Sequence, residues 1–175
     1  MSNTTELNGG QEGTMPMAPI IINGQYIKDL SFENPTPLDS LSNSKEMPEI
    51  SVNVDIKANA VQDNTYEVSL SVSADALRKD QKGEKKRLFL VELEYSGVFT
   101  LNIPDQNAIH PILMIECPRL LFPSARSLIA TVTREAGFPA LSLNPIDFAE
   151  LYRQQFLKDQ PMDADGATSD SKKDH

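Results

Sequence analysis

The sequence predicts an α+β fold, in which a four-stranded antiparallel sheet is backed by two C-terminal helices. Two patterns lead to this prediction. In four runs between residues 20 and 99, apolar side chains recur at every second position, which is the period of a half-buried strand. After residue 108 the apolar spacing changes to three and four residues, as on one face of an amphipathic helix. Strands followed by helices, without an internal repeat, favour helices gathered on one face of an antiparallel sheet.

The chain of 175 residues is long enough for one domain with a hydrophobic core. Hydrophobic residues make up 39 % of it and concentrate between residues 20 and 157, so a folded domain is expected over residues 20–158. Residues 1–19 and 159–175 are polar and can bury too little to offset chain entropy. They are expected to form a disordered N-terminal arm and a disordered C-terminal tail.

The first strand is expected over residues 20–32. Strict alternation divides its side chains between an apolar face with Tyr26, Leu30 and Phe32 and an acidic face with Asp29 and Glu33. Residues 34–37, Asn-Pro-Thr-Pro, end the strand because proline cannot donate to a ladder and restricts the residue before it. A loop to about Pro48 follows.

Residues 50–58 and 66–74 predict the second and third strands. In each run apolar side chains alternate with polar ones, so each strand has one packed face and one face toward water. The intervening Gln62-Asp63-Asn64 is typical of a turn. An antiparallel hairpin is therefore predicted.

The fourth run, residues 88–99, has a mixed outer face. Its two sides carry Phe89, Val91, Leu93 and Tyr95 on one, and Leu88, Leu90, Glu92 and Glu94 on the other. Two neighbouring leucines on an outer sheet face need a covering partner. We therefore expect this face to form an interface, as in a homo-oligomer.

Residues 121–132 carry the stripe of an amphipathic helix, formed by Leu121, Ala125, Leu128, Ile129 and Val132. Gly137 suits the C-terminal cap of that helix. Pro118 and Pro123 allow two beginnings, one near Pro123 and one near Ile109 with a kink at the prolines. The longer, kinked helix is favoured.

A second helix is expected to begin at Asn144-Pro145, which offers an N-cap and a proline at the first helical position. We expect it to end near Leu157. Its buried stripe would contain Phe148, Leu151 and Tyr152.

The composition argues against several functions. A formal charge of −9 disfavours nucleic acid, because the one basic cluster, residues 82–87, lies between two predicted strands and is typical of a solvated turn. Two histidines and one cysteine give no metal-ligand spacing. No run approaches the roughly 20 apolar residues of a membrane span, and the N-terminus has no basic and apolar leader. We therefore expect no direct membrane insertion and a cytoplasmic location.

Enzymatic chemistry has little support in the sequence. Cys117 and His110 are the candidate nucleophile and base, but a single cysteine most often packs as a small apolar residue. No glycine-rich phosphate loop is present. We expect no enzyme and no cofactor. An enzyme centred on Cys117 and His110 would lose turnover when either residue is replaced.

Three separated blocks of sequence indicate a family more specifically than composition and spacing do. They are YIKDLSFENP at residues 26–35, CPRLLFPSAR at residues 117–126 and GFPALSLNPIDF at residues 137–148. Together they resemble the SecB family, in one order over residues 20–157. The resemblance implies a homotetramer built as a dimer of dimers, and a chaperone that binds unfolded secretory precursors in the cytoplasm. It would keep these preproteins competent for translocation and deliver them to the SecA motor without using ATP itself.

The resemblance also implies a SecA-binding surface at Asp29, Glu33, Leu90 and Glu92. Unfolded clients are expected in a groove between the sheet-edge strand and the loop that joins the helices. The expected walls of this groove are Phe122, Phe138, Leu141, Leu143, Phe148 and Tyr152. Ordinary core positions are the alternative for these six residues. Departures from the family pattern occur at Ser124, Ser142 and the charged turn over residues 78–87.

A second hypothesis is a non-catalytic homo-oligomeric adaptor. It would use the same sheet face for assembly but bind a single folded partner. The range of clients separates the two hypotheses, since a chaperone binds unfolded chains of many sequences and the adaptor binds one folded protein.

Overall fold

The computed structural model describes residues 18–40, 47–79 and 83–157. The predicted N-terminal arm, except for its last two residues, and the predicted C-terminal tail lie outside the described residues. The same holds for the middle of the charged turn, at residues 80–82. The expected division into an arm, a domain and a tail therefore stays a prediction.

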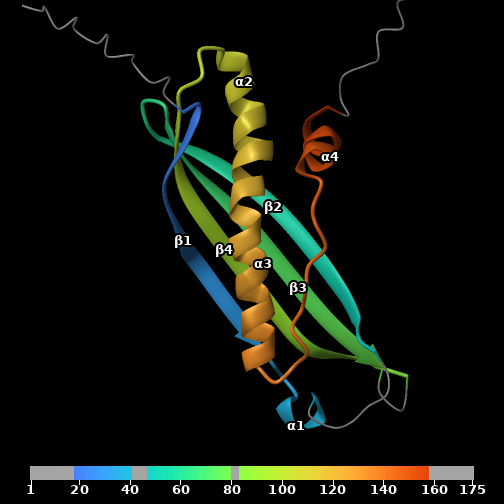
Figure 1. Ribbon diagram of the computed structural model, residues 1–175. Helices are drawn as coiled ribbons and strands as arrows, with labels where there is room; N and C mark the ends of the chain where they lie inside the picture. The colour runs from blue at the N-terminus through green and yellow to red at the C-terminus, as the bar shows by residue number, and fades with distance from the viewer. Residues whose placement is uncertain (1–17, 41–46, 80–82, 158–175) are drawn as a thin grey trace, which may run out of the picture.

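Four long strands form one antiparallel sheet, as predicted. They are β1 (Ile20–Glu33), β2 (Glu49–Gln62), β3 (Thr65–Lys79) and β4 (Lys85–Leu101). Their order in the sheet is β1-β4-β3-β2, so that β1 and β2 are the two edges (Figure 1). The predicted hairpin joins β2 to β3 through Asp63-Asn64, and Asn64 takes a positive φ of 56°, which asparagine tolerates better than most residues.

One long helical segment covers the sheet. It consists of α2 (Gln106–Pro111), a π-helical turn η1 (Ile112–Glu116) and α3 (Cys117–Glu135), without a break between them. The long helix is therefore confirmed and the beginning near Pro123 is wrong. The wider π-helical turn lies directly before Pro118, where the proline ring would otherwise crowd the carbonyl four residues earlier.

Gly137 caps the C-terminus of α3, as predicted. Gly137 has a φ of 91° and donates its N–H to the carbonyl of Arg134 at 3.0 Å. Phe138 donates to the carbonyl of Thr133 at 3.1 Å. These two bonds form the Schellman motif, which uses a left-handed residue to close the last helical turn.

The second helix begins later than predicted. α4 (Phe148–Tyr152) and the π-helical η2 (Arg153–Leu157) follow residues 138–147, which have no regular secondary structure. The N-cap is Asp147, whose Oδ1 accepts the N–H of Glu150 at 2.9 Å, so the prediction of Asn144-Pro145 is wrong. Asparagine and aspartate are N-caps of similar strength, so residue type alone does not distinguish Asn144 from Asp147. A short helix, α1 (Pro37–Ser40), lies in the region that was expected to be loop.

A bulge in β1 overturns the predicted placement of Tyr26. The register of β1 against β4 shifts between Ile27 and Asp29, and the extra residue reverses the alternation of side chains. Tyr26 therefore lies on the same face as Asp29 and Glu33. Leu30 and Phe32 face the helices, and Asp29 and Glu33 share the opposite face, as predicted.

A second irregularity overturns the placement of Leu88. Ala76 and Leu77 pair with Phe89 and Arg87, which leaves Leu88 without a cross-strand partner. Its side chain is 6 % exposed and belongs to the hydrophobic core. The predicted outward pair of leucines is therefore wrong, since only Leu90 lies on the outer face, where it is half-buried.

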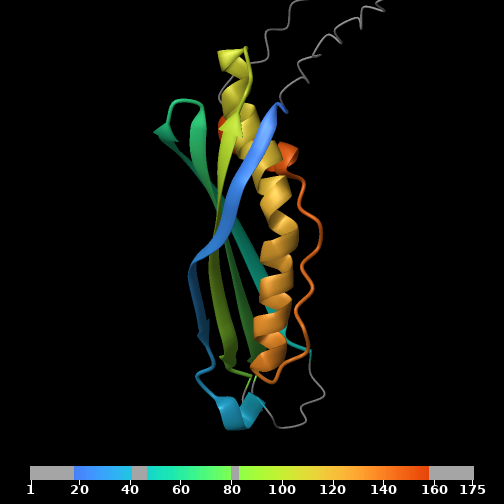
Figure 2. The ribbon, with the colours of Figure 1, turned by 60° about the vertical axis from the view of Figure 1, so that its left-hand side comes forward.

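The core lies between α3 and one face of the sheet. Leu121, Ala125 and Ile129 of α3 are fully buried against the apolar side chains of β3 and β4. Figure 2 shows the long helix on one side of the sheet and no helix on the other side. Gly97 on β4 allows the close approach, because Leu121 Cδ2 lies 2.8 Å from the place that a Cβ would occupy.

Replacing Gly97 with alanine is expected to destabilise the fold by about 1–3 kcal/mol, through overpacking against Leu121 and the ring of Phe99. Urea unfolding of the variant would measure the loss. Gly24→Ala on β1 is the matched control, because a Cβ there meets no atom within 4 Å. Equal stabilities of the two variants would contradict this account of the helix–sheet contact.

Candidate functional site

The helix-free face of the sheet brings the predicted acidic residues together. In the pairing of β1 with β4, Asp29 lies opposite Glu94 and Glu33 lies opposite Leu90. Glu92 lies opposite Ser31, between these two pairs. Directly opposed side chains in an antiparallel pair have Cβ atoms about 5 Å apart and point to the same side. The four residues Asp29, Glu33, Leu90 and Glu92 therefore form one surface, which we call the acidic face.

Most other carboxylates of the sheet are paired with a cation. Lys28, the extra residue of the β1 bulge, contacts Glu67 at 3.1 Å and Glu94 at 3.4 Å. The guanidinium of Arg87 donates two hydrogen bonds of 2.9 Å to Asp75. Lys28 and Arg87 thus neutralise part of the negative charge on the helix-free face of the sheet.

The acids of the acidic face are different. Among the residues that the structure describes, Asp29, Glu33 and Glu92 form no salt bridge, and all three are exposed. Glu92 accepts one long hydrogen bond, 3.4 Å, from the hydroxyl of Ser31. Arg87 lies close enough to Glu33 and Glu92 for their charges to raise the pKa of its guanidinium, after the larger effect of Asp75, but it forms no salt bridge with either. Carboxylates without a salt bridge, around the half-buried Leu90, suit a basic partner with an apolar contact residue.

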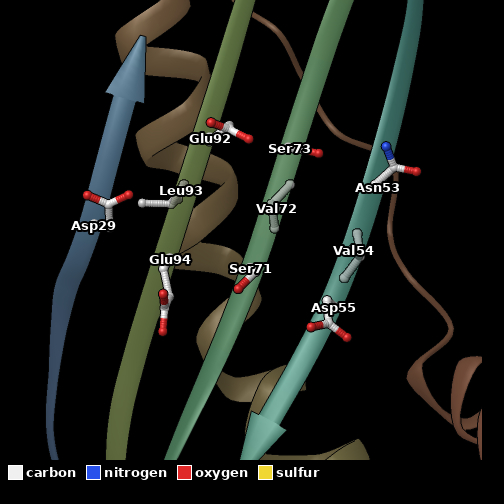
Figure 3. Close-up of a pocket in the computed structure, with 10 residues that line it drawn as sticks. All are labelled: Asp29, Asn53, Val54, Asp55, Ser71, Val72, Ser73, Glu92, Leu93 and Glu94. Carbon is white, nitrogen blue, oxygen red and sulfur yellow. The ribbon is translucent and has the colours of Figure 1, made fainter.

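Two acids next to the acidic face were not predicted. The pairing across all four strands places Asp29, Glu94, Ser71 and Asp55 in one row. This row borders a shallow hollow of about 340 Å³, shown in Figure 3, which Asn53 and Ser73 also line. Asp55 was missed because its place depends on the strand register, and the sequence gives no register across four strands. Alternation within β4 had placed Glu94 on the same face as Glu92, but Glu94 was not assigned to the site.

A hydrogen-bonded network lies at the edge of this surface. The Tyr26 hydroxyl donates to Glu67 Oε1, and Lys28 Nζ donates to Glu67 Oε2 at 3.1 Å. The hydrogen bond from Tyr26, followed by that from Lys28, lowers the pKa of Glu67. The same bond to Glu67 raises the pKa of Tyr26. The network exists because the bulge turns Tyr26 and Lys28 onto the acidic side.

The six predicted groove residues do not lie in one place. Phe138 packs against Phe89, with ring centroids 4.8 Å apart, and also against Phe32. Phe122 and Phe148 form a separate edge-to-face pair, with centroids 5.9 Å apart. Tyr152 contacts the rings of His110 and Phe156 instead. The structure therefore divides the four aromatic residues of the predicted groove among three ring clusters.

The six residues also differ in exposure. Three of them are buried in the core, namely Phe122 at 8 %, Leu143 at 4 % and Phe148 at 1 % exposed. The other three, Phe138, Leu141 and Tyr152, are half-buried. A client could contact the second set directly and the first set only after a movement of neighbouring chain, so the groove stays a prediction.

The β2 edge carries apolar surface that the sequence did not single out. Ile50 and Val52 are 39 % and 43 % exposed. Both pair with alanines of β3 that face the helices, so they lie on the helix side of the sheet. A free strand edge beside exposed apolar side chains can accept an extended polypeptide.

The pair proposed for an enzyme is not assembled. Cys117 is fully buried, and burial raises the pKa of its thiol to about 12, so the thiol stays protonated. His110 Nδ1 lies 3.0 Å from the hydroxyl of Tyr152 instead. Within the described ranges no group of three metal-ligating side chains occurs. None of the described helices is both long and apolar enough to cross a membrane.

Comparison with known proteins gives a consistent result. A family model described as preprotein translocase subunit SecB matches residues 13–159. A protein-export protein SecB of Rhodopseudomonas palustris is 45 % identical over 151 residues, which cover 86 % of this chain and 90 % of that protein. A protein of the same name from Paramagnetospirillum magneticum is 50 % identical over 133 residues, or 75 % of this chain and 82 % of its own.

A solved structure shares the fold. It is a SecB-like chaperone of Mycobacterium tuberculosis in complex with a peptide from an antitoxin, with a TM-score of 0.56. The likeness covers 73 % of this chain and 91 % of that chain, at 12 % sequence identity. At that identity it bears on the fold alone.

Replacing Tyr26 with phenylalanine is expected to raise the pKa of Glu67 toward its ordinary value of 4.5. Because the folded-state pKa is lowered, the network stabilises the fold above about pH 4.5, and this contribution is lost as pH falls through the folded pKa. The stability difference between wild type and variant should therefore shrink in acid. Carbon-13 NMR titration of Glu67 and urea unfolding at neutral and acid pH would test this. Glu150, whose pKa is lowered by Gln154 and Arg153, is an internal control that should titrate unchanged.

Proposed function

The chain belongs to the SecB family of protein-export chaperones, and from that premise we propose that it holds unfolded secretory precursors in the cytoplasm and passes them to the SecA motor. Its role as an export chaperone follows from the family model and from relatives that share 42–50 % of their residues with it over most of the chain. The family is one of chaperones rather than of enzymes, and the family model and the similar relatives favour a chaperone over a single-partner adaptor.

SecA is proposed to dock on the acidic face. The observation that carries this proposal is the lack of a salt bridge at Asp29, Glu33 and Glu92 within the described chain, while Glu67, Glu94 and Asp75 are paired. A basic segment of the motor would supply the missing cations. Leu90, opposite Glu33, would give such a segment an apolar contact at its centre.

Unfolded clients are proposed to bind on the helix side, along β2 and the segment between the helices. The half-buried Leu141 and Tyr152 and the exposed Ile50 and Val52 support this place. Phe122, Leu143 and Phe148 would join the groove only when the short α4 moves away. A chaperone that binds only the unfolded state shifts the folding equilibrium by mass action, and no nucleotide is needed.

The working unit is proposed to be a dimer of dimers. β1 is a sheet edge and carries large apolar side chains that are 37–45 % exposed in the single chain, namely Ile22, Tyr26, Ile27 and Leu30. Edge pairing with a second copy would cover them. Contacts between the long helices of two such pairs would complete the homotetramer that the family resemblance implies.

The proposal is tested by charge removal on the acidic face. Asp29→Asn, Glu33→Gln and Glu92→Gln together are expected to abolish capture of SecA, because the basic segment loses its counter-charges. The same triple variant should still arrest the refolding of a slow-folding precursor, since the clients bind elsewhere. Refolding kinetics and a SecA pull-down measure the two activities separately.

A matched control removes three carboxylates from the helices. Glu116→Gln, Glu135→Gln and Glu150→Gln change the net charge equally, and all three acids are exposed partners of neighbouring arginines. Exposed pairs of this kind contribute little to stability. Loss of SecA capture in the control would show that net charge, and not the acidic face, recruits the motor. Refolding that is not delayed by wild type would reject the chaperone function.

A further inference from the structure

The segment between α3 and α4 holds its shape without a ladder of backbone hydrogen bonds. Residues 138–147 form neither helix nor strand, yet Leu143 within them is only 4 % exposed. Backbone amides of such a segment must find partners among side chains or water. Two side chains of α3 bond to the segment, one at a backbone amide and one at a side-chain hydroxyl.

The first contact comes from Thr133, which is fully buried near the end of α3. Its hydroxyl lies 2.9 Å from the carbonyl oxygen of Ile129, to which it donates. The hydroxyl oxygen of Thr133 in turn accepts the backbone N–H of Leu141 at 2.9 Å. Thr133 is therefore bonded to the helix and to the connecting segment at once.

The second contact comes from Arg126, which lies two helical turns before Thr133. Its Nη2 donates to Ser142 Oγ at 2.8 Å. Residues seven apart share one side of a helix and are separated by about 10 Å along its axis. Consecutive residues of the segment, Leu141 and Ser142, are thus held from two levels of α3.

These contacts fix which side chains of the segment face the core. Leu141 is half-buried, Ser142 is exposed and Leu143 is buried, as expected for an extended chain with alternating sides. A slip by one residue would bury the hydroxyl of Ser142 and expose Leu143, which is costly in both respects. Ser142, which interrupts the apolar run, is the residue that Arg126 binds.

We propose that Thr133 and Arg126 are positioning residues for client binding, because they lock the register of Leu141-Ser142-Leu143 and so preform one wall of the groove. The inference rests on the proposed function. The ligand is an extended, apolar stretch of unfolded polypeptide, which needs an ordered wall to pack against. When only a fraction of the molecules has the binding-competent conformation, the apparent dissociation constant rises in inverse proportion to that fraction.

The test compares two pairs of variants in the full-length chain. Thr133→Val keeps the shape of the side chain and removes the oxygen, whereas Thr133→Ser keeps the oxygen. Arg126→Met removes the donor to Ser142, and Arg119→Met is its control, because Arg119 contacts Glu116 on the same helix. The probe is reduced, carboxymethylated α-lactalbumin, labelled for fluorescence anisotropy. Hydrogen exchange at the Leu141 amide reports directly on the hydrogen bond from that amide to Thr133.

In Thr133→Val and Arg126→Met we expect the dissociation constant of the probe to rise about five- to tenfold, as for a binding-competent state of reduced population. Leu141 should exchange faster in Thr133→Val. Thr133→Ser and Arg119→Met should bind like wild type, and SecA capture should not change in any variant. If Thr133→Val fails to fold, Arg126→Met decides the matter, since Arg126 is only half-buried.

The outcomes distinguish a failure of the proposed function from a failure of the positioning role alone. A wild-type protein that does not bind the probe would reject the proposed function, and the positioning role with it. A wild-type protein that binds the probe, with Thr133→Val and Arg126→Met binding equally well, would overturn the positioning role alone. Faster hydrogen exchange at Leu141 without weaker binding of the probe would also overturn the positioning role alone.

Discussion

The packing of α3 against β3 and β4 determines what each face of the sheet can do. Leu121 approaches β4 at Gly97, where no side chain separates helix from strand. This contact, with Ala125 and Ile129 beside it, closes one face of the sheet with apolar side chains. The other face has no helix and is free to carry charge (Figure 2). A single close contact therefore divides the molecule into an apolar side and a charged side.

Bulges then decide how charge is distributed on the open face. The extra residue at Lys28 turns Tyr26 and Lys28 onto that face, where Lys28 contacts Glu67 and Glu94. Lys28 is the cation that this part of β1 contributes, and its salt bridges are with those two acids. Asp29, which follows in the chain, forms no salt bridge with a described residue. A one-residue irregularity thus separates carboxylates that are paired with Lys28 from a carboxylate that is not.

Much of the fold could be predicted from the sequence, because alternation and helical spacing are local. The four strands, the long helix and the cap at Gly137 needed only such patterns. Tyr26 and Leu88 were placed wrongly because a bulge shifts the alternation, and a single sequence does not mark where a bulge falls. The start of α4 was misplaced because two cap signals compete, and Asp147 makes the observed bond.

The candidate site was less accessible to sequence reasoning than the fold. The four residues of the acidic face came from a family resemblance, and the strand pairing brings them together. Glu94 lies on the same face by local alternation, whereas the place of Asp55 depends on a register across the strands, which is not a local property. For the groove, helical spacing cannot distinguish a core aromatic from a binding aromatic, because both face the apolar side. Phe148 and Tyr152 share one stripe, yet one is buried and the other half-exposed.

The two-sided architecture has a consequence for transfer of a client. A precursor on the helix side and a motor on the acidic face would occupy opposite surfaces of one sheet, so neither would exclude the other by contact. The two contacts also differ physically, since apolar packing is not screened by ions while an exposed charge contact is screened over about 8–10 Å at ordinary ionic strength. With the two partners at the proposed sites, the motor would associate with a loaded chaperone and leave it without disturbing the apolar contacts. Release of the client would then require a change on the helix side itself, where the segment held by Thr133 and Arg126 is the part without regular backbone pairing.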